Sequence, residues 1–446
     1  MAKPTVESPP PFNPAKDFEA TLPLLGKCEV TDPKGRYLHW NLFKWRVPSA
    51  KATVLWKVVK FKRMAQYKDI GLSDVRGKQF VYCTPPSMEA MLYQITTNAG
   101  GKVGAVGGTA ASDSIQDRFL ISSLIMEEAI TSAQLEGAST TREVAKKMLE
   151  DEREPVDEDE RMILNNYLLI KHAEQCCSEN LSVDMILEFH RIATSGTTGN
   201  GVVPGEFRQA NDIFIDDGRG NIAHQPPDFN LLHDRLLALC DFANQDHSGE
   251  AGSTFIHPVI KAITLHFMIG YEHPFRDGNG RTARALFYWY MLKSEYNLFK
   301  YLSISKVLKE RPRDYGLAYL YTETDDNDLT YFIYHQLETI QKAFNELGSY
   351  LNQKAKEFEE ISAVLERTTW GSTLTFIQKD LIKKAVKEPG RVFTVKEIAN
   401  SYSISDNTAR GHLTKLVEQK LFFCSKDGRA IIYIAPSDLA SKLNKR

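Results

Sequence analysis

Apolar residues recur at helical spacing through most of the chain. Ile115, Phe119, Met126, Ala129 and Ala133 fall on one helical face, and Gly137 then interrupts this helix before Thr140 or Thr141 caps the next one. The same spacing predicts six further helices, at 158–178, 183–195, 228–245, 256–272, 281–293 and 327–352. The predicted fold class is therefore mainly α.

One segment breaks this helical pattern. Residues 204–226 contain the apolar run Ile213–Ile215, turn signals at 217–220, and a second run at Asn221–His224. Two short runs separated by such a turn predict a β-hairpin inside the helical domain. An isolated hairpin has little stability of its own, so we expect this one to cover another feature.

The two ends of the chain differ from its centre. Residues 1–14 are Pro-rich and are expected to be mobile. Residues 15–112 predict a small, largely helical subdomain with short strands and no chemistry, and 113–157 form a separate helical region before the 158–352 core. Residues 371–440 predict a helix at 374–388, a helix-turn-helix that ends at Lys420 and a final hairpin, which is the order of a winged helix.

Length and charge support this division. A chain of 446 residues exceeds one compact domain, and its 42% hydrophobic and 25% charged residues indicate a globular protein. Residues 371–446 carry 14 Lys and Arg against 7 Asp and Glu, which leaves 41 against 50 in residues 1–370. A basic C-terminal module on an acidic body suggests an anionic partner for that module.

The cysteines and the hydropathy pattern bear on the compartment. The six cysteines form no Cys-x-x-Cys pair, so reduced thiols are expected and a structural zinc site has no support. No apolar run approaches the length of a membrane span, and the first residues lack the apolar stretch of a signal peptide. We therefore expect a cytoplasmic protein without membrane contact.

The segment from His273 to Arg284, HPFRDGNGRTAR, carries the strongest chemical pattern. Gly278, Asn279 and Gly280 can present successive backbone N–H groups at a helix N-terminus, a geometry that binds phosphate. Arg281 and Arg284 lie three residues apart on one helix face and imply more than one phosphate. Asp277 would repel these phosphates unless an Mg²⁺ ion lay between them. His273 can accept a proton near neutral pH. Together these groups predict nucleotide transfer to a hydroxyl.

This segment resembles the Fic family motif H-P-F-x-[D/E]-G-N-G-R-x-x-R at every defined position. The resemblance extends over roughly residues 115–345 and includes the Pro204–Arg208 lead into the hairpin. It implies a Fic helical core with a β-hairpin flap, and the predicted N-terminal helical subdomain and C-terminal winged helix-turn-helix lie outside it. Most Fic proteins move AMP from ATP to a Ser, Thr or Tyr hydroxyl of a protein.

The resemblance also implies roles for individual residues. His273 would be the catalytic base and Asp277 the Mg²⁺ ligand, while Gly278, Asn279 and Gly280 would form the anion hole. Arg281 would pair with the β-phosphate and Arg284 with the γ-phosphate. Phe275 would anchor the loop, and Tyr315 is either an adenine contact or an ordinary tyrosine. The target segment would be held by strand addition along the flap residues Ile213, Phe214, Ile215, Asn221, Ile222, Ala223 and His224.

A second motif lies upstream of the core. Ser132-Ala-Gln-Leu-Glu136-Gly137 matches the inhibitory pattern [S/T]-x-x-x-E-[G/N] of the N-terminal Fic class. The resemblance implies that Glu136 pairs with Arg284 and occupies the guanidinium that the γ-phosphate needs. An exposed helical glutamate without such a role is the alternative interpretation.

Other functions remain open at this level. UMP transfer, phosphate transfer and removal of AMP occur in related proteins, although Gly280 is retained where phosphate-transferring variants have Lys. The winged helix would make the chain a DNA-binding regulator, and its candidate DNA contacts are Asn407, Arg410, His412, Lys415 and Arg429. Docking of a protein on the winged helix is the alternative. The target protein, another copy of this chain included, and the oligomeric state are not determined by the sequence.

Overall fold

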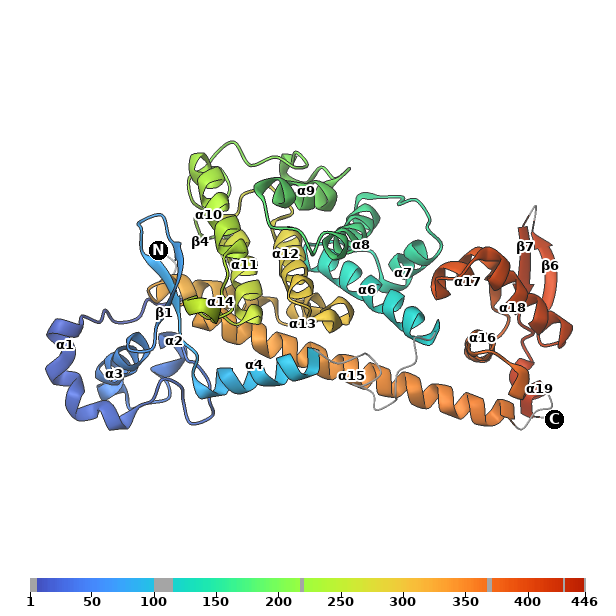
Figure 1. The fold of residues 1–446 in the computed structure, drawn as a ribbon, viewed down its shortest axis with the longest axis horizontal. Helices are drawn as coiled ribbons and strands as arrows, with labels where there is room; N and C mark the ends of the chain where they lie inside the picture. The colour runs from blue at the N-terminus through green and yellow to red at the C-terminus, as the bar shows by residue number, and fades with distance from the viewer. Residues whose placement is uncertain (1–5, 100–114, 217–219, 367–370, 428–429, 445–446) are drawn as a thin grey trace.

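The computed structural model describes residues 6–99, 115–216, 220–366, 371–427 and 430–444. The chain is mainly helical, as predicted, and is elongated along the helix α15 (Thr330–Glu366). The N-terminal subdomain lies at one end of this helix and the C-terminal module at the other (Figure 1). Its 37 residues extend over about 55 Å, at about 1.5 Å per residue.

The N-terminal subdomain combines helices with one hairpin. Its elements are α1 (Pro14–Thr21), α2 (Trp40–Phe43), α3 (Ala52–Met64), the antiparallel strands β1 (Lys68–Ser73) and β2 (Gln79–Tyr82), and α4 (Pro86–Ala99). Within the Pro-rich segment, Val6 is buried and Glu7 accepts a hydrogen bond from the Trp40 indole at 2.9 Å. That residues 1–14 are mobile remains a prediction.

The central domain is a set of packed helices. They are α6 (Ile115–Leu135), α7 (Arg142–Glu150), α8 (Glu158–Gln175), α9 (Val183–Thr194), α10 (Leu232–Asn244), α11 (Pro258–Glu272), α12 (Asn279–Lys293), α13 (Ile304–Glu310), α14 (Pro312–Thr324) and α15. The helices α13 and α14 were not predicted, because the seven residues of α13 give too few turns for a clear period and α14 has only Ala318 and Thr322 buried, so it shows no clear apolar face. Short segments of 3₁₀ helix lie between the elements: η1 (Leu22–Lys27), η2 (Ser49–Lys51), η3 (Gly199–Gly201), η4 (Phe229–Leu231), η5 (Glu250–Gly252), η6 (Asn297–Tyr301) and η7 (Gly371–Thr373).

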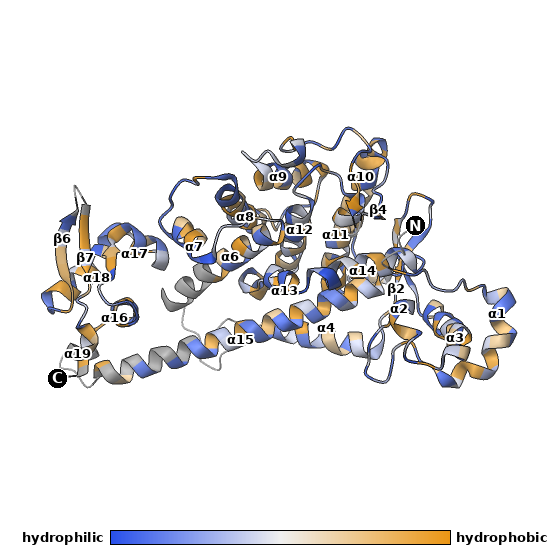
Figure 2. Cartoon of the chain, turned by 180° about the vertical axis from the view of Figure 1, so that it is seen from behind, coloured by the Kyte–Doolittle hydropathy of each residue, from blue (hydrophilic) through white to orange (hydrophobic). Residues whose placement is uncertain are grey.

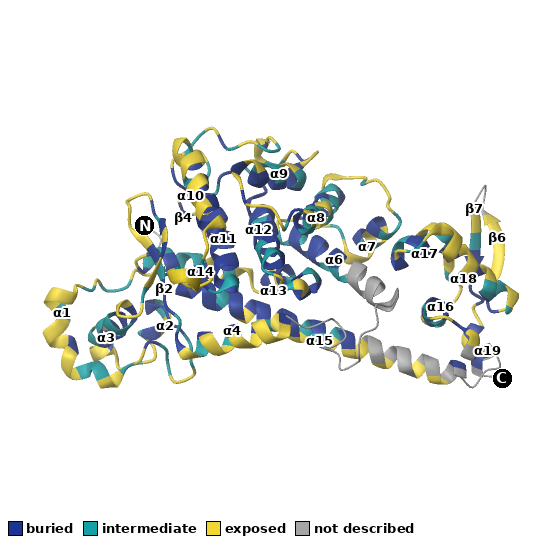
Figure 3. Ribbon diagram, in the orientation of Figure 1, coloured by how far each residue is buried: buried dark blue, intermediate teal, exposed yellow. Residues whose placement is uncertain are grey.

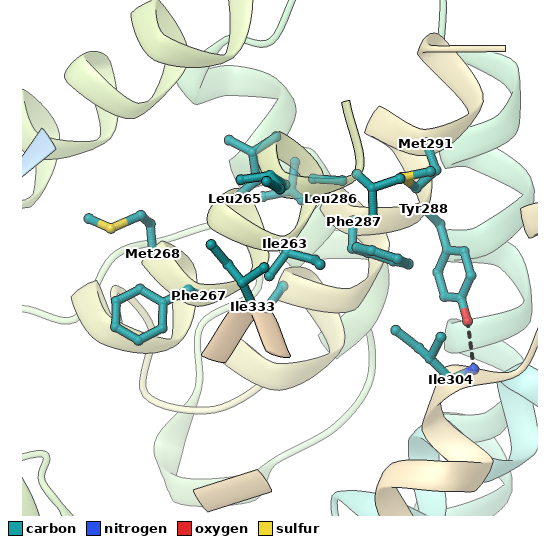
Figure 4. Close-up of a cluster of buried hydrophobic side chains, with 14 of the residues drawn as sticks. Ile263, Leu265, Phe267, Met268, Leu286, Phe287, Tyr288, Met291, Ile304 and Ile333 are labelled. Atoms are coloured by element: carbon teal, nitrogen blue, oxygen red, sulfur yellow. Dashed lines mark hydrogen bonds between the residues drawn. The ribbon is translucent and has the colours of Figure 1, made fainter. Parts of the chain in front are cut away.

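The helices α11 and α12 form the centre of the domain. Both are buried along almost their whole length (Figure 3). Their apolar side chains, among them Ile263, Phe267 and Leu286, pack against Ile304 of α13 and Ile333 of α15 (Figure 4). Along its coloured part, α15 alternates hydrophilic and hydrophobic residues, as expected of a helix with one packed face (Figure 2). The turn between α11 and α12 is therefore held between two helices that are buried along almost their whole length.

The predicted hairpin is present but short. Strand β3 (Ile215–Asp216) pairs antiparallel with β4 (Ile222–His224), with Ile215 opposite His224. Ile213, Phe214 and Asn221 lie just outside the strands. Of the predicted turn, residues 217–219 lie outside the described part of the chain.

The C-terminal module has its own core. It contains α16 (Phe376–Lys387), β5 (Val392–Thr394), α17 (Val395–Tyr402), α18 (Asp406–Glu418), β6 (Phe423–Asp427), β7 (Ala430–Ile434) and α19 (Leu439–Asn444), with an antiparallel sheet in the order β5-β7-β6. The predicted helices and hairpin are present, and β5 and α19 add to them. The assignment of this arrangement to a winged helix remains a prediction.

Candidate functional site

The turn between α11 and α12 adopts left-handed backbone at two positions. His273 ends α11 with φ 44° and ψ 56°, and Gly278 precedes α12 with φ 79°. A Cβ on Gly278 would lie 2.7 Å from the Thr194 methyl carbon, so only glycine fits there. Because α12 begins at Asn279, the N–H groups of its first turn have no partner within the helix and point toward the loop.

Side chains within the loop fix its shape. The Asn279 amide oxygen accepts from the Phe275 N–H at 3.0 Å, and its amide nitrogen donates to the Phe275 carbonyl at 2.9 Å. Asn279 is buried, so its side chain braces the loop and only its backbone remains for an anion. Phe275 is also buried, in the anchoring position predicted for it.

His273 lies at the end of α11 in a largely desolvated position. Burial lowers the pKa of its imidazole to about 4, so the ring is neutral at pH 7. Nδ1 lies 3.4 Å from the Gly270 carbonyl, and Nε2 has no hydrogen-bond partner among the described residues. The backbone carbonyl of His273 accepts from Arg208 Nε at 3.0 Å. The ring is thus held in place with one nitrogen open to accept a proton.

The next charged pair joins Asp277 and Arg281. Arg281 Nη2 donates to the Asp277 carboxylate at 2.9 Å, while Nη1 donates to the Ala193 carbonyl at 2.7 Å. The Arg281 side chain is buried, and its Nε has no partner in the described structure. Both predicted ATP contacts are therefore engaged with each other in this state of the chain.

Glu136 reaches the same loop from the end of α6. Its carboxylate accepts from Arg284 Nη2 at 2.8 Å, and Ser132 Oγ accepts from Arg284 Nε at 3.0 Å. A Cβ built on Gly280 would lie 2.2 Å from Glu136 Oε1, so the carboxylate lies directly against the loop backbone. Gly137 follows α6 with φ 106°, which lets the chain turn away immediately after Glu136.

Arg284 is a buried cation whose guanidinium keeps a hydrogen-bond donor without a partner in the described structure. Burial opposes its charge, but the Glu136 carboxylate, with Tyr315 and Glu128, outweighs that effect and raises the pKa of Arg284. Its Nη1 is buried and has no hydrogen-bond partner within the described residues. That nitrogen would lie 3.0 Å from a Cβ on Gly280, beside the first turn of α12. Unpaired donors thus gather where the sequence predicted phosphate.

Tyr315 lies in the core on one side of this site. Its hydroxyl pairs with His266 Nε2 at 2.8 Å and lies 3.4 Å from the Tyr319 hydroxyl. The charge of Arg284 acts on the Tyr315 hydroxyl, so the ring is close to the guanidinium. A contact to adenine remains a prediction, since the hydroxyl already has protein partners.

The flap presents a mixed surface. Phe214 and Ile222 are exposed, an arrangement suited to binding an apolar side chain. His224 is buried instead, with Nδ1 on Glu323 at 2.7 Å and Nε2 on the Tyr271 carbonyl at 2.7 Å. Its imidazole therefore anchors the flap to α11 and α14, and only its backbone remains for strand addition.

Of two further residues of the site, His190 was not singled out from the sequence and Arg208 was named only as part of the Pro204–Arg208 lead. The ring of His190 stacks on Phe275 with centroids 3.7 Å apart, accepts from the Gly205 N–H at Nδ1, and donates from Nε2 to the Asp277 carbonyl at 3.0 Å. Burial lowers the pKa of His190 to about 4. Arg208 links Pro227, Ala210 and the backbone of His273. One histidine on an apolar helix face gives no signal of such a role in a single sequence.

The candidate DNA contacts of α18 do not all face outward. Asn407 and Arg410 are exposed. Lys415 Nζ donates to the Thr373 carbonyl at 3.1 Å, and His412 Nδ1 pairs with Thr375 Oγ1 at 3.3 Å, so both side chains lie toward the start of α16. Arg429 falls outside the described residues.

The region that holds the loop is similar to known proteins. Residues 180–291 match the Fic/DOC family model. Over 158 residues, 35% of this chain, the sequence is 28% identical to the protein adenylyltransferase Fic of Drosophila virilis and 29% identical to that of Drosophila melanogaster. The match spans 30% and 29% of those two proteins.

Solved structures resemble the chain more loosely. A Fic family protein from Desulfovibrio desulfuricans aligns with a TM-score of 0.47 and 18% identity, over 77% of this chain and 95% of that chain. Fic-1 from C. elegans aligns with a TM-score of 0.43 and 17% identity, over 60% and 73%. Within the described residues, no helix combines the length and apolar character needed to cross a membrane.

Proposed function

We propose that this Fic-domain chain is a protein adenylyltransferase that moves AMP from ATP to a Ser, Thr or Tyr hydroxyl and is inhibited by its own Glu136. The observation that carries the proposal is the meeting of His273, the first turn of α12 and Arg284 around one loop, with the Glu136 carboxylate 2.8 Å from Arg284. The named relatives support AMP as the transferred group.

His273 acts as the base. In the proposed reaction the target hydroxyl oxygen bonds to the α-phosphorus of ATP, the bond from that phosphorus to pyrophosphate breaks, and His273 takes the hydroxyl proton. The lowered pKa keeps the imidazole neutral and therefore able to accept that proton at pH 7. The hydrogen bond from Arg208 to the His273 carbonyl holds the residue in position.

The start of α12 holds the phosphates. The free N–H groups of its first turn, with the unpaired Nη1 of Arg284, offer fixed donors to negatively charged oxygens. Glu136 competes for the same place, since it lies against Gly280 and pairs with Arg284. We infer that ATP binds productively only when this carboxylate moves away.

Asp277 is suited to Mg²⁺ that arrives with the nucleotide. No cluster of three or more His, Cys, Asp or Glu side chains suited to a metal occurs within residues 6–99, 115–216, 220–366, 371–427 and 430–444. Mg²⁺ in nucleotide sites is commonly held by one or two carboxylates and the phosphates themselves, and the partly exposed Asp277 fits that use. When bound, the ion would neutralise charge on the phosphates.

The flap would position the target. Its backbone at Ile215 and Ile222–His224 lies at the edge of a two-stranded sheet, and an extended target segment can pair with such an edge. The exposed Phe214 and Ile222 would contact its side chains. Target identity, whether another protein or a second copy of this chain, is left open by main-chain recognition.

Labelled nucleotides test this function directly. The Glu136→Gly variant incubated with lysate and α-labelled ATP should transfer label to protein, while γ-labelled ATP should transfer none. Transfer from the γ position alone would mean phosphate transfer and would contradict the proposal. UTP as donor distinguishes UMP transfer, and a premodified target that loses AMP distinguishes the reverse activity.

A second function rests on the C-terminal module. Its excess of Lys and Arg and the exposure of Asn407 and Arg410 on α18 favour binding to duplex DNA. The module would then add DNA binding to the transferase. Docking of a protein on α18 is the alternative, and the salt dependence of binding separates the two.

A further inference from the structure

The N-terminal subdomain contains a cavity of about 610 Å³. Residues between Gly26 and Arg63 line it, from η1, the following loop, α2 and α3. These elements lie at the end of the molecule opposite the C-terminal module (Figure 1). Its lining includes no residue of the loop between α11 and α12, so it is separate from that site, and its size is that of a small-molecule site.

The inner wall of the cavity is apolar. Leu38, Phe43 and Val59 line it and are each at most 8% exposed. Arg63 is buried beside them, but its guanidinium donates to the Val30 and Leu38 carbonyls and to the Tyr331 hydroxyl. Since these donors are engaged within the protein, the inner wall offers contact to hydrocarbon rather than to a charged group.

The mouth of the cavity is basic. Lys27, Lys34 and Arg46 line it and are exposed, and none has a carboxylate within 4.0 Å in the described part of the chain. The two carboxylates of the lining are already paired: Asp32 with Arg36 at 2.8 Å, and Glu29 with Lys62 at 2.7 Å. Three uncompensated cations therefore surround an apolar chamber.

We propose that this cavity binds an amphipathic anion, with an apolar body against Leu38, Phe43 and Val59 and a carboxylate or phosphate head at Lys27, Lys34 and Arg46. The apolar wall supplies burial of the body, and the cations supply charge complementarity for the head. A bare anion would leave the chamber unfilled, and a neutral lipid would leave the mouth without its counter-charge.

Titration calorimetry on the full chain tests the ligand class with four ten-carbon probes. Decanoate and decyl phosphate should each bind at one site, and which binds more tightly identifies the preferred head group. Decanol and decylamine should bind at least about tenfold more weakly, because neither carries a negative charge. Equal binding of all four probes, or no binding by either anion, would overturn the proposal.

A charge reversal at the mouth tests the location. Arg46→Glu should weaken decanoate binding at least about tenfold, and raised salt should reduce the difference. Lys171→Glu makes the same change in charge on the exposed surface of α8 and should leave binding unaltered. Unchanged affinity in Arg46→Glu, or equal losses in both variants, would place the anion elsewhere.

Cys28 provides a readout within the cavity. It is half-buried in the lining, and burial raises the pKa of its thiol, whereas Cys424 is exposed on β6. Saturating decanoate should slow alkylation of Cys28 and leave Cys424 unchanged, as followed by peptide mass spectrometry. Equal rates at Cys28 with and without ligand would contradict binding in this chamber. Protection of Cys28 by an acidic peptide but not by decanoate would replace the small molecule with a polypeptide partner.

Discussion

The Glu136 carboxylate and the Arg284 guanidinium meet at 2.8 Å although 148 positions separate them in the chain. The contact brings the end of α6 onto the first turn of α12, where Glu136 lies against Gly280. A carboxylate in this place repels phosphate and occupies an Arg284 donor that the phosphate would otherwise use. Activity of the wild-type chain should therefore be low until this pair separates.

Replacing Glu136 should release the site. Glu136→Gly should raise transfer from α-labelled ATP by roughly 10- to 100-fold, since a hydrogen bond to a charged group contributes about 1.5–3 kcal/mol. Addition of His273→Ala should remove about 10²–10⁴ in rate because the hydroxyl loses its proton acceptor. Glu136→Gln is the matched control: it keeps the size of the side chain but removes its charge, so it separates the effect of the charge from that of the space filled. Equal rates for wild type and Glu136→Gly would contradict inhibition.

The burial of His273 predicts an unusual pH dependence. Its pKa of about 4 means that the base gains a proton only as the pH falls toward that value. The pH dependence of kcat/KM reports the pKa values of the free enzyme. In Glu136→Gly, kcat/KM should therefore fall at acid pH with a midpoint well below pH 6.5. Loss of the carboxylate lowers this pKa further, since Glu136 raises it. A midpoint at or above 6.5, with circular dichroism showing a folded protein, would refute this assignment.

Substitution of Asp277 should change both the Mg²⁺ requirement of transfer and the stability of the fold. Asp277→Asn keeps an oxygen for the buried Arg281 but loses the charge, so it should remain folded and need at least about tenfold more Mg²⁺ for half-maximal transfer. Asp277→Ala should also lower the melting temperature, because a buried donor loses its partner at a cost of about 1–3 kcal/mol. Transfer that persists in excess chelator would remove Asp277 from the metal role.

His190 should act as a positioning residue for the loop. His190→Phe keeps a ring to stack on Phe275 but removes the hydrogen bonds to Gly205 and Asp277, so kcat should fall roughly tenfold. His172→Phe is the control, because His172 lies on α8 and packs on Phe189 instead. The effect should appear in kcat rather than in KM for ATP. A change in melting temperature alone, with kcat preserved, would mean a purely structural role.

The orientation of α18 separates two candidate DNA contacts. Arg410→Ala should weaken binding to duplex DNA by roughly tenfold and reduce the salt slope by about one, as for loss of one phosphate contact. Lys415→Ala should have a smaller effect on DNA binding, since its ammonium group donates to Thr373. Gel shifts at several salt concentrations measure both. Equal losses in the two variants would contradict this orientation, and no DNA binding at low salt would favour protein docking.

The sequence by itself determined the elements and the chemistry that lie close together in the chain. Helical spacing predicted the cores of α8, α9, α11 and α12, because the period of an amphipathic or buried helix is a local property. The segment from His273 to Arg284 holds a base, two glycines and three arginines within twelve residues, so its phosphate chemistry could be inferred without a fold. The charge difference between the two ends of the chain was equally visible.

Only the tertiary structure decided which partner each polar group takes. Arg281 pairs with Asp277 and with Ala193, which lies 88 positions away, Lys415 turns to Thr373, and His190 joins two loops from an apolar helix face. The cavity between η1, α2 and α3 likewise arises from segments that carry no motif. Buried donors and acceptors must find partners wherever packing brings them together, and that packing depends on the whole fold rather than on neighbouring residues.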